Sequence, residues 1–320
     1  MFRIKQSLDA VNYGAYFYDG RALTMEEIVD RAVSFGYEAV DIWPHRPLCF
    51  PMDYDKQKRK QLLDYARSRG IKFAAVDAAN NFMRTDHVLV PRLEKELLYV
   101  RECCELARDL DCPIVRILPA FLGYFWPIYW NQGYGNIAIH SRSLEVSKME
   151  DYLAEWEAIR EGISESGRIA QDYGITLAVQ GHPPVTNNVK DMIDMVDEIN
   201  LENVKIGLDL SLFDNQEPDF IRQTVLTVGK RMVHSHTLGI ILKSGPHGFI
   251  FASEEVIPGE GIENWIPFFK ACKEVGYEGY FGYEQCAPFL MPGHKKPTLD
   301  EFDRRQKVGF DFLKSLEEKI

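Results

Sequence analysis

Short apolar runs alternate with longer amphipathic segments along the whole chain. Apolar runs bounded by turn residues predict β-strands, and apolar positions three and four residues apart predict helices. Glycine follows several of the helical segments, as left-handed helix caps require. The predicted strands cover residues 2–8, 39–43, 71–76, 113–118, 175–180, 204–210, 232–236 and 280–284, and the predicted helices cover residues 24–36, 55–69, 92–110, 149–173, 189–199, 220–228, 265–275 and 299–316.

Eight strand–helix units in this order predict a parallel sheet that closes into a (β/α)8 TIM barrel. An open doubly wound sheet is the alternative, but no GxGxxG motif follows the first strand to bind a dinucleotide. No change of composition marks a domain boundary. The sequence therefore predicts one α/β domain over residues 1–320, with extended loops after strands four and seven and an aromatic-rich insertion at about 119–147.

Composition narrows the class of protein. The chain has 320 residues and a formal net charge of -11, and its length fits a barrel of roughly 250 residues with added loops. The acidic surplus argues against nucleic-acid binding and against a polybasic membrane anchor. We find no secretory signal and no apolar run long enough to cross a membrane. The six cysteines show no CxxC spacing, which is typical of free thiols, so we expect a cytoplasmic protein.

Polar side chains stand at the ends of four successive predicted strands, where the active sites of such barrels lie. Gln180 ends strand five, Asp209 strand six, His236 strand seven and Glu284 strand eight. Two carboxylates, one imidazole and one amide oxygen are suitable ligands for a divalent cation. We predict that these four residues bind a metal ion, with manganese preferred and cobalt, magnesium or zinc as alternatives. For Gln180, a hydrogen bond to one of the ligands is the other role considered.

Further residues near the strand ends are candidates for catalysis and substrate binding. Glu284 is expected to act as a base as well as a ligand, and histidines supply the other acid/base candidates. Arg116 has an internal salt bridge as its alternative role, and His234 that of an ordinary buried histidine. The predicted catalytic residues are Glu284, His182, His45 and His140, and the predicted substrate-binding residues are Arg116, Trp126, Tyr129, Trp43 and His234.

The segment after strand four is unusually aromatic. It holds seven aromatic residues within 14 positions, between Phe121 and Tyr134. A sugar needs one stacking ring at most, so this density suggests an aromatic aglycone or a protein partner. A lid packed on the barrel is the structural alternative.

Several short segments resemble the xylose isomerase-like superfamily of sugar isomerases and epimerases. In that resemblance Gln180 stands where the family has a glutamate ligand, and Leu212 stands where it has a histidine. Asp209, His236 and Glu284 match the other ligand positions. The segments that carry the resemblance are 177–182, 207–212, 234–236, 258–261 and 277–284.

The aromatic segment narrows the resemblance to the catalytic subunit of C-glycoside deglycosidases. It implies a 3-oxo-glycoside substrate, removal of the proton at sugar C2, and loss of the aromatic aglycone from C1. It also implies a small β-sheet partner subunit; a homo-oligomer is the other partner considered. The departure at Gln180 argues against epimerisation by two carboxylate bases, because an amide is not a base.

The predicted function is therefore a metal-dependent enzyme that removes a proton next to a carbonyl, with C-glycoside cleavage as the specific reaction. A ketose 3-epimerase or sugar isomerase is the alternative enzyme. A non-catalytic sugar-binding subunit is the alternative of another class, because a disabled relative would also lack the glutamate and histidine replaced by Gln180 and Leu212.

Overall fold

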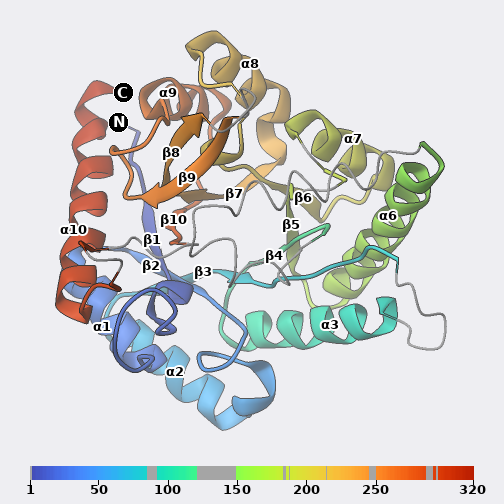
Figure 1. The fold of residues 1–320 in the computed structure, drawn as a ribbon. Helices are drawn as coiled ribbons and strands as arrows, with labels where there is room; N and C mark the ends of the chain where they lie inside the picture. The colour runs from blue at the N-terminus through green and yellow to red at the C-terminus, as the bar shows by residue number, and fades with distance from the viewer. Residues whose placement is uncertain are drawn as a thin grey trace.

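Eight parallel strands form a closed barrel in the computed structural model (Figure 1). The order around the barrel is β1, β10, β7, β6, β5, β4, β3 and β2, which confirms the predicted TIM barrel. The structure describes residues 2–84, 92–120, 149–182, 185–186, 188–213, 215–244, 250–285, 291–292 and 295–320. The barrel strands are β1 (Gln6–Asp9), β2 (Ala39–Ile42), β3 (Lys72–Asp77), β4 (Ile114–Ile117), β5 (Thr176–Gln180), β6 (Val204–Gly207), β7 (Met232–Thr237) and β10 (Phe281–Tyr283).

The helices of the described part surround the barrel (Figure 1). α1 and α10 each begin with a capping box, formed by Thr24 with Glu27 and by Thr298 with Glu301. None of the helices formed by described residues has the length and apolar composition of a membrane span. Their bounds are α1 (Met25–Phe35), α2 (Lys56–Ser68), α3 (Leu93–Asp109), α6 (Met149–Asp172), α7 (Val189–Ile199), α8 (Pro218–Val228), α9 (Trp265–Val275) and α10 (Leu299–Ser315).

Strand register brings the polar strand ends together at one end of the barrel. Asp9 of β1 pairs with Asp41 of β2, and Asp77 of β3 pairs with Arg116 of β4. His236 of β7 pairs with Gly282 of β10. Because parallel strands finish at the same edge, the side chains at these positions face a common space.

The segment after β7 differs from the predicted loop. It contains an antiparallel hairpin of β8 (Gly239–Ser244) and β9 (Ile250–Val256), which is separate from the barrel sheet. Among the described residues, these strands pair only with each other. Their sequences mix apolar with polar residues and lack the continuous apolar pattern of a central barrel strand, which is why the segment was expected to be a loop. Strand one begins at Gln6 rather than residue 2, and strand six ends at Gly207 rather than residue 210. The predicted insertion lies largely outside the described residues, at 121–148.

Candidate functional site

The four predicted metal ligands meet at the carboxyl end of the barrel. Gln180 ends β5, and His236 lies in β7. Glu284 directly follows β10, and Asp209 lies two residues after the end of β6. All four are buried, and the most exposed of them, Glu284, has an exposed fraction of 8%.

His236 is the centre of this group. Its Nδ1 lies 3.1 Å from Oε2 of Glu284 and 3.8 Å from Oδ2 of Asp209. The side-chain nitrogen of Gln180 lies 3.1 Å from the same Nδ1 and also donates a hydrogen bond to Asp209 Oδ2. The backbone N–H of His236 donates to Asp209 Oδ1 at 2.6 Å, which fixes the carboxylate with its other oxygen toward the imidazole. The structure thus brings all four predicted ligands together.

The chemistry of this donor set fits a divalent cation. It combines one imidazole nitrogen with two carboxylates, the mixture that manganese, zinc and cobalt accept. Burial raises the pKa of Asp209, and a bound cation would offset that cost. Burial alone would lower the pKa of His236, but the carboxylates of Glu284 and Asp77 raise it well above its usual range. Gln180 presents its amide nitrogen here, and turning the amide over would present its oxygen instead.

Arg116 is an internal ion-pair partner of this site. Its Nη2 lies 3.2 Å from Oε1 of Glu284, and its Nε lies 3.4 Å from Oδ1 of Asp77. Burial alone would lower the pKa of Arg116, but Asp77 and Glu284 outweigh burial and raise it. Arg116 therefore makes the internal salt bridges that were its alternative role, and its contact with a substrate stays a prediction.

A second polar layer lies beneath the ligands, and sequence reasoning did not select most of it. Asp9, Asp41 and Asp77 come from β1, β2 and β3, and each is completely buried. His236 Nε2 lies 3.2 Å from Asp77 Oδ2 and 3.0 Å from Nε2 of His234. A signal was available for Asp77, which ends a short apolar run, and a weaker one for Asp9, which directly follows the predicted strand 2–8.

Burial and neighbouring charge set the protonation of this layer. Burial together with Asp77 raises the pKa of Asp9, and the same two causes raise that of Asp41 to about 7. Burial would also raise the pKa of Asp77, but Arg116 and His236 outweigh burial and lower it. Burial and the adjacent His236 lower the pKa of His234 to about 3, so its ring is neutral near pH 7.

Gly282 makes room for this lower layer. A Cβ atom at position 282 would lie 2.2 Å from Oδ2 of Asp41 and 2.9 Å from Cδ2 of His236. Ser7 donates a hydrogen bond to the same Asp41 oxygen at 2.6 Å. The absence of a side chain on β10 therefore allows Asp41 to reach inward beside His236.

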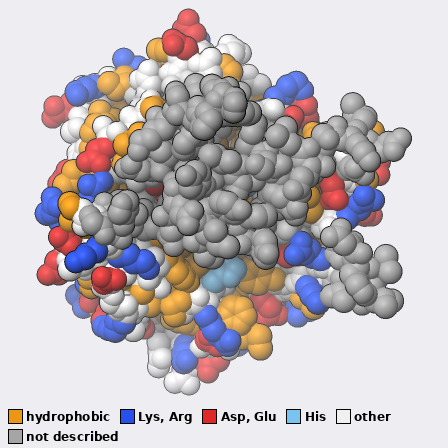
Figure 2. Space-filling model, viewed as in Figure 1, with side chains coloured by type: hydrophobic (Ala, Val, Ile, Leu, Met, Phe, Trp, Pro, Cys, Tyr) orange, Lys and Arg blue, Asp and Glu red, His pale blue; other side chains and the backbone are white. Residues whose placement is uncertain are grey.

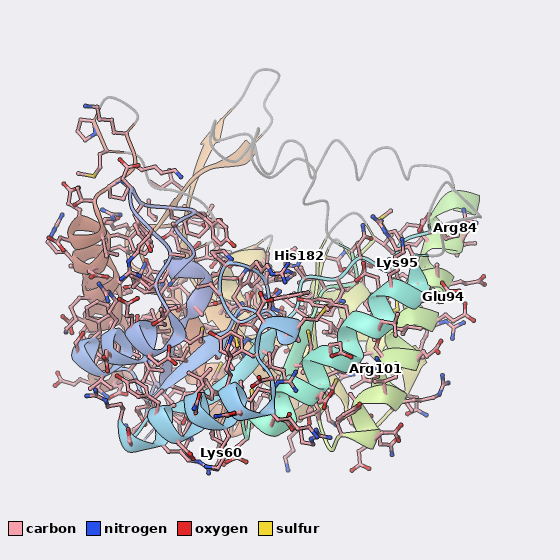
Figure 3. All side chains as sticks on the ribbon, turned by 90° about the horizontal axis from the view of Figure 1, so that it is seen from below. Lys60, Arg84, Glu94, Lys95, Arg101 and His182 are labelled. Carbon is pink, nitrogen blue, oxygen red and sulfur yellow. The ribbon has the colours of Figure 1, made fainter. Side chains whose placement is uncertain are left out.

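Two of the predicted acid/base histidines, His182 and His45, lie at the edge of the site. His182 follows β5 and is labelled in Figure 3 at the end of the barrel from which the β8–β9 hairpin projects. Burial, with a contribution from Arg116, lowers the pKa of both His182 and His45 to about 4. Both rings are therefore neutral near pH 7 and able to accept a proton.

His45 belongs to a small aromatic group. Its ring centroid lies 4.6 Å from that of Trp43, and its Nε2 lies 2.9 Å from the hydroxyl oxygen of Tyr99. On the face of the molecule seen in Figure 2, histidine atoms lie beside hydrophobic side chains of the described residues. The predicted site residues His140, Trp126 and Tyr129 lie outside the described residues.

Comparison with known proteins places this chain in a family. Residues 29–307 match the sequence profile described as xylose isomerase-like TIM barrel. The chain is 25% identical over 183 residues to the D-psicose 3-epimerase of Ruminiclostridium cellulolyticum, which covers 56% of this chain and 51% of that protein. It is 23% identical over 304 residues to the D-psicose 3-epimerase of Enterocloster bolteae, which covers 90% of this chain and 86% of that protein.

A solved structure shows the same fold. The structure of the IOLI protein with a bound zinc atom has a TM-score of 0.70 and 18% sequence identity. The similarity covers 97% of this chain and 98% of that one. The first of the two epimerases is matched over only about half its length, whereas this fold similarity extends over almost the whole barrel.

Proposed function

Because the chain belongs to the xylose isomerase-like TIM-barrel family, we propose that it is a divalent-metal-dependent enzyme of the sugar isomerase and epimerase type. The observation that carries this proposal is the convergence of Glu284, Asp209 and Gln180 on Nδ1 of His236 in a buried site. The similarity to two D-psicose 3-epimerases supports a keto sugar as substrate. The reaction is removal of a proton from the carbon next to the carbonyl group.

Each group in the site has a part in that reaction. These four residues would hold a divalent ion, which would supply positive charge to polarise the carbonyl. Glu284 accepts the proton, and its ion pair with Arg116 fixes the direction of the carboxylate. His182 is neutral near pH 7. It accepts a proton from a sugar hydroxyl group, or returns a proton to the opposite face of the sugar.

Gln180 limits the choice of reaction. Epimerisation by two opposed carboxylates needs a base where this chain has an amide. With Glu284 as the one ligand that we assign as a base, transfer of a proton between neighbouring carbons is the simplest outcome. An epimerase would need His182 or His45 as its second base.

A C-glycoside lyase is the second candidate, and Gln180 together with the aromatic sequence between Phe121 and Tyr134 favours it. Elimination needs only one base. Glu284 would take the C2 proton of a 3-oxo-glycoside, the C2–H electron pair would form the C1–C2 double bond, and the aromatic group would leave C1 and take up a proton. The lyase proposal also includes manganese as the ion, a small β-sheet partner or a homo-oligomer, and a cytoplasmic location.

A solvent-exchange experiment tests both candidates. Chelator-stripped protein is reloaded with Mn2+, Co2+, Mg2+ or Zn2+ and incubated in D2O with D-psicose, D-fructose or an aromatic 3-oxo-glucoside. Deuterium in an interconverted ketose supports the isomerase or epimerase, and metal-dependent release of the aglycone supports the lyase. Sugar binding without conversion, exchange or aglycone release for any ion contradicts the proposed enzyme activity and supports a binding subunit.

A further inference from the structure

A second group of side chains that could bind a metal lies at the Nε2 side of the His236 ring. Glu284, Asp209 and Gln180 lie at the Nδ1 side and form, with His236, the upper ligand set. The members of the second group, Asp41, Asp77 and His234, come from β2, β3 and β7, and each is at most 1% exposed. One ligand atom from each, together with one from His236, lies within 4.8 Å of all the others. None of the three belongs to the upper ligand set.

The separation between two of the proposed ligand atoms is close to the edge of a coordination shell. Bonds of about 2.0–2.1 Å in a tetrahedral site place ligand atoms roughly 3.3 Å apart. His234 Nε2 lies 3.6 Å from Asp77 Oδ1. His236 Nε2 lies at hydrogen-bond distance from both residues, 3.0 Å from His234 Nε2 and 3.2 Å from Asp77 Oδ2.

One unsatisfied oxygen atom points to a missing positive partner. Asp41 Oδ1 is fully buried and accepts no hydrogen bond from the described residues. Asp77 Oδ1 also accepts no hydrogen bond from them, but Arg116 Nε lies 3.4 Å away as its charged neighbour. The other oxygen of Asp41 is held by Ser7. Buried carboxylate oxygens in proteins normally have a donor or a cation, so an oxygen without either needs an explanation.

The charge of the site gives the same indication. Five buried carboxylates share this end of the barrel, and Arg116 is the one arginine or lysine in the described part of the chain that pairs with any of them. If all five were ionised, one divalent ion in the upper set and Arg116 would balance three negative charges and leave two. One further divalent cation would balance those two; without it protons balance them, in keeping with the raised pKa values of Asp9 and Asp41. The five carboxylates belong to Asp9, Asp41, Asp77, Asp209 and Glu284.

We propose that Asp41, Asp77 and His234 bind a second divalent transition-metal ion beneath the upper site. Two carboxylates and one imidazole are a ligand set suited to Zn2+ or Mn2+. His236 joins the two sites: Nδ1 faces the upper ligands, and Nε2–H donates to Asp77, a ligand of the lower ion. The lower ion balances the charge of the pocket floor and holds the ring of His236 in place.

Counting bound metal tests this proposal without any measurement of activity. Chelator-stripped protein is equilibrated with excess Zn2+, and in a separate sample with Mn2+, desalted, and analysed for metal and protein. The wild type is expected to bind two ions per chain. Asp41→Asn, which keeps an oxygen for Ser7, is expected to retain one ion, and Asp209→Asn is expected to retain the other.

Matched variants keep the test interpretable. Asp303→Asn changes a partly buried aspartate of α10 that pairs with Arg31, and it is expected to retain two ions. Circular dichroism checks that each variant is folded, and His234→Gln replaces Asp41→Asn if the latter does not fold. One ion in the wild type, kept by Asp41→Asn and lost in Asp209→Asn, overturns the second site and means that protons balance the carboxylates. Two ions without sugar turnover would instead retain this proposal and contradict the proposed function.

Discussion

Arg116 and Glu284 form an ion pair across the mouth of the barrel, with Nη2 of the first 3.2 Å from Oε1 of the second. β4 and β10 stand on opposite sides of the strand order, so this pair spans the site rather than joining neighbours. It fixes the carboxylate that we assign as the base, and it does so from a fully buried position.

Removal of Arg116 should therefore be costly. Arg116→Met leaves two buried carboxylates without their guanidinium, and we expect the free energy of unfolding to fall by about 3–5 kcal/mol. Urea denaturation of the metal-free protein measures this. The control is Arg222→Met, which breaks a half-exposed pair with Glu274 and should cost less than about 1 kcal/mol. Equal losses in the two variants would contradict the role of Arg116.

Glu284→Gln should abolish proton abstraction. The amide cannot accept the proton, so we expect the rate of solvent deuterium exchange to fall by about 100-fold or more. The rate is measured at saturating metal, which separates the loss of a base from a loss of metal affinity. Glu263→Gln, at a buried glutamate bound to the backbone of Ile240, should exchange like the wild type. Exchange within a few-fold of normal in Glu284→Gln would transfer the role of base to His182.

Gln180→Glu should have opposite effects with and without metal. A second carboxylate next to Asp209 adds buried negative charge, so we expect the metal-free protein to lose roughly 2 kcal/mol of unfolding free energy. With Mn2+ the added charge becomes a ligand, and the tighter binding should reverse the loss. Thermal unfolding in chelator and in Mn2+ measures both states.

The control for this substitution is Gln306→Glu. Gln306 is also fully buried, but it accepts a hydrogen bond from Asn12, and neither residue belongs to the ligand set. It should therefore be destabilising under both conditions. A Gln180→Glu protein that is equally destabilised with and without metal would show that position 180 does not face the ion.

Glu263 should make stability depend on pH. Burial raises its pKa to about 7, although its hydrogen bond from the backbone N–H of Ile240 opposes the change. The folded protein then holds a proton that the unfolded chain has released, so the stabilising contribution is complete below pH 4.5 and is lost as the pH rises to 7. Glu263→Gln has no such loss. Its stability relative to the wild type should increase by about 2 kcal/mol between pH 4 and pH 8.

Urea denaturation at several pH values measures this difference. Glu260→Gln alters a half-exposed carboxylate that pairs with Arg305, and it should show nearly the same small difference at every pH. A pH-independent difference for Glu263→Gln would show that its carboxyl titrates normally in the folded protein.

The barrel and the meeting of the four candidate ligands could be predicted from the order of the strands. Gln180, Asp209, His236 and Glu284 each stand at the end of a predicted strand, and parallel strands place such ends at one edge. Asp9 and Asp77 directly follow predicted strands in the same way, but isolated carboxylates have no characteristic spacing. Only the register of the strands and the closure of the barrel show that they meet His236.

Other features depended on contacts that a single sequence does not reveal. The β8–β9 hairpin forms a separate two-stranded sheet. Its apolar residues come directly after β7, so they were assigned to the loop after that strand. The ion pair of Arg116 with Glu284 joins residues 168 positions apart, so the sequence alone was consistent with both roles of Arg116, substrate binding and an internal salt bridge.

Gly282 determines how closely Asp41 approaches the polar centre. With any side chain at position 282, the carboxylate of Asp41 would have to withdraw from His236, whereas Asp9 and Asp77 would not meet the added atom. The lower layer would then keep two of its three carboxylates. One missing methyl group on the last barrel strand therefore sets how many ionisable groups replace the low-dielectric core beneath His236.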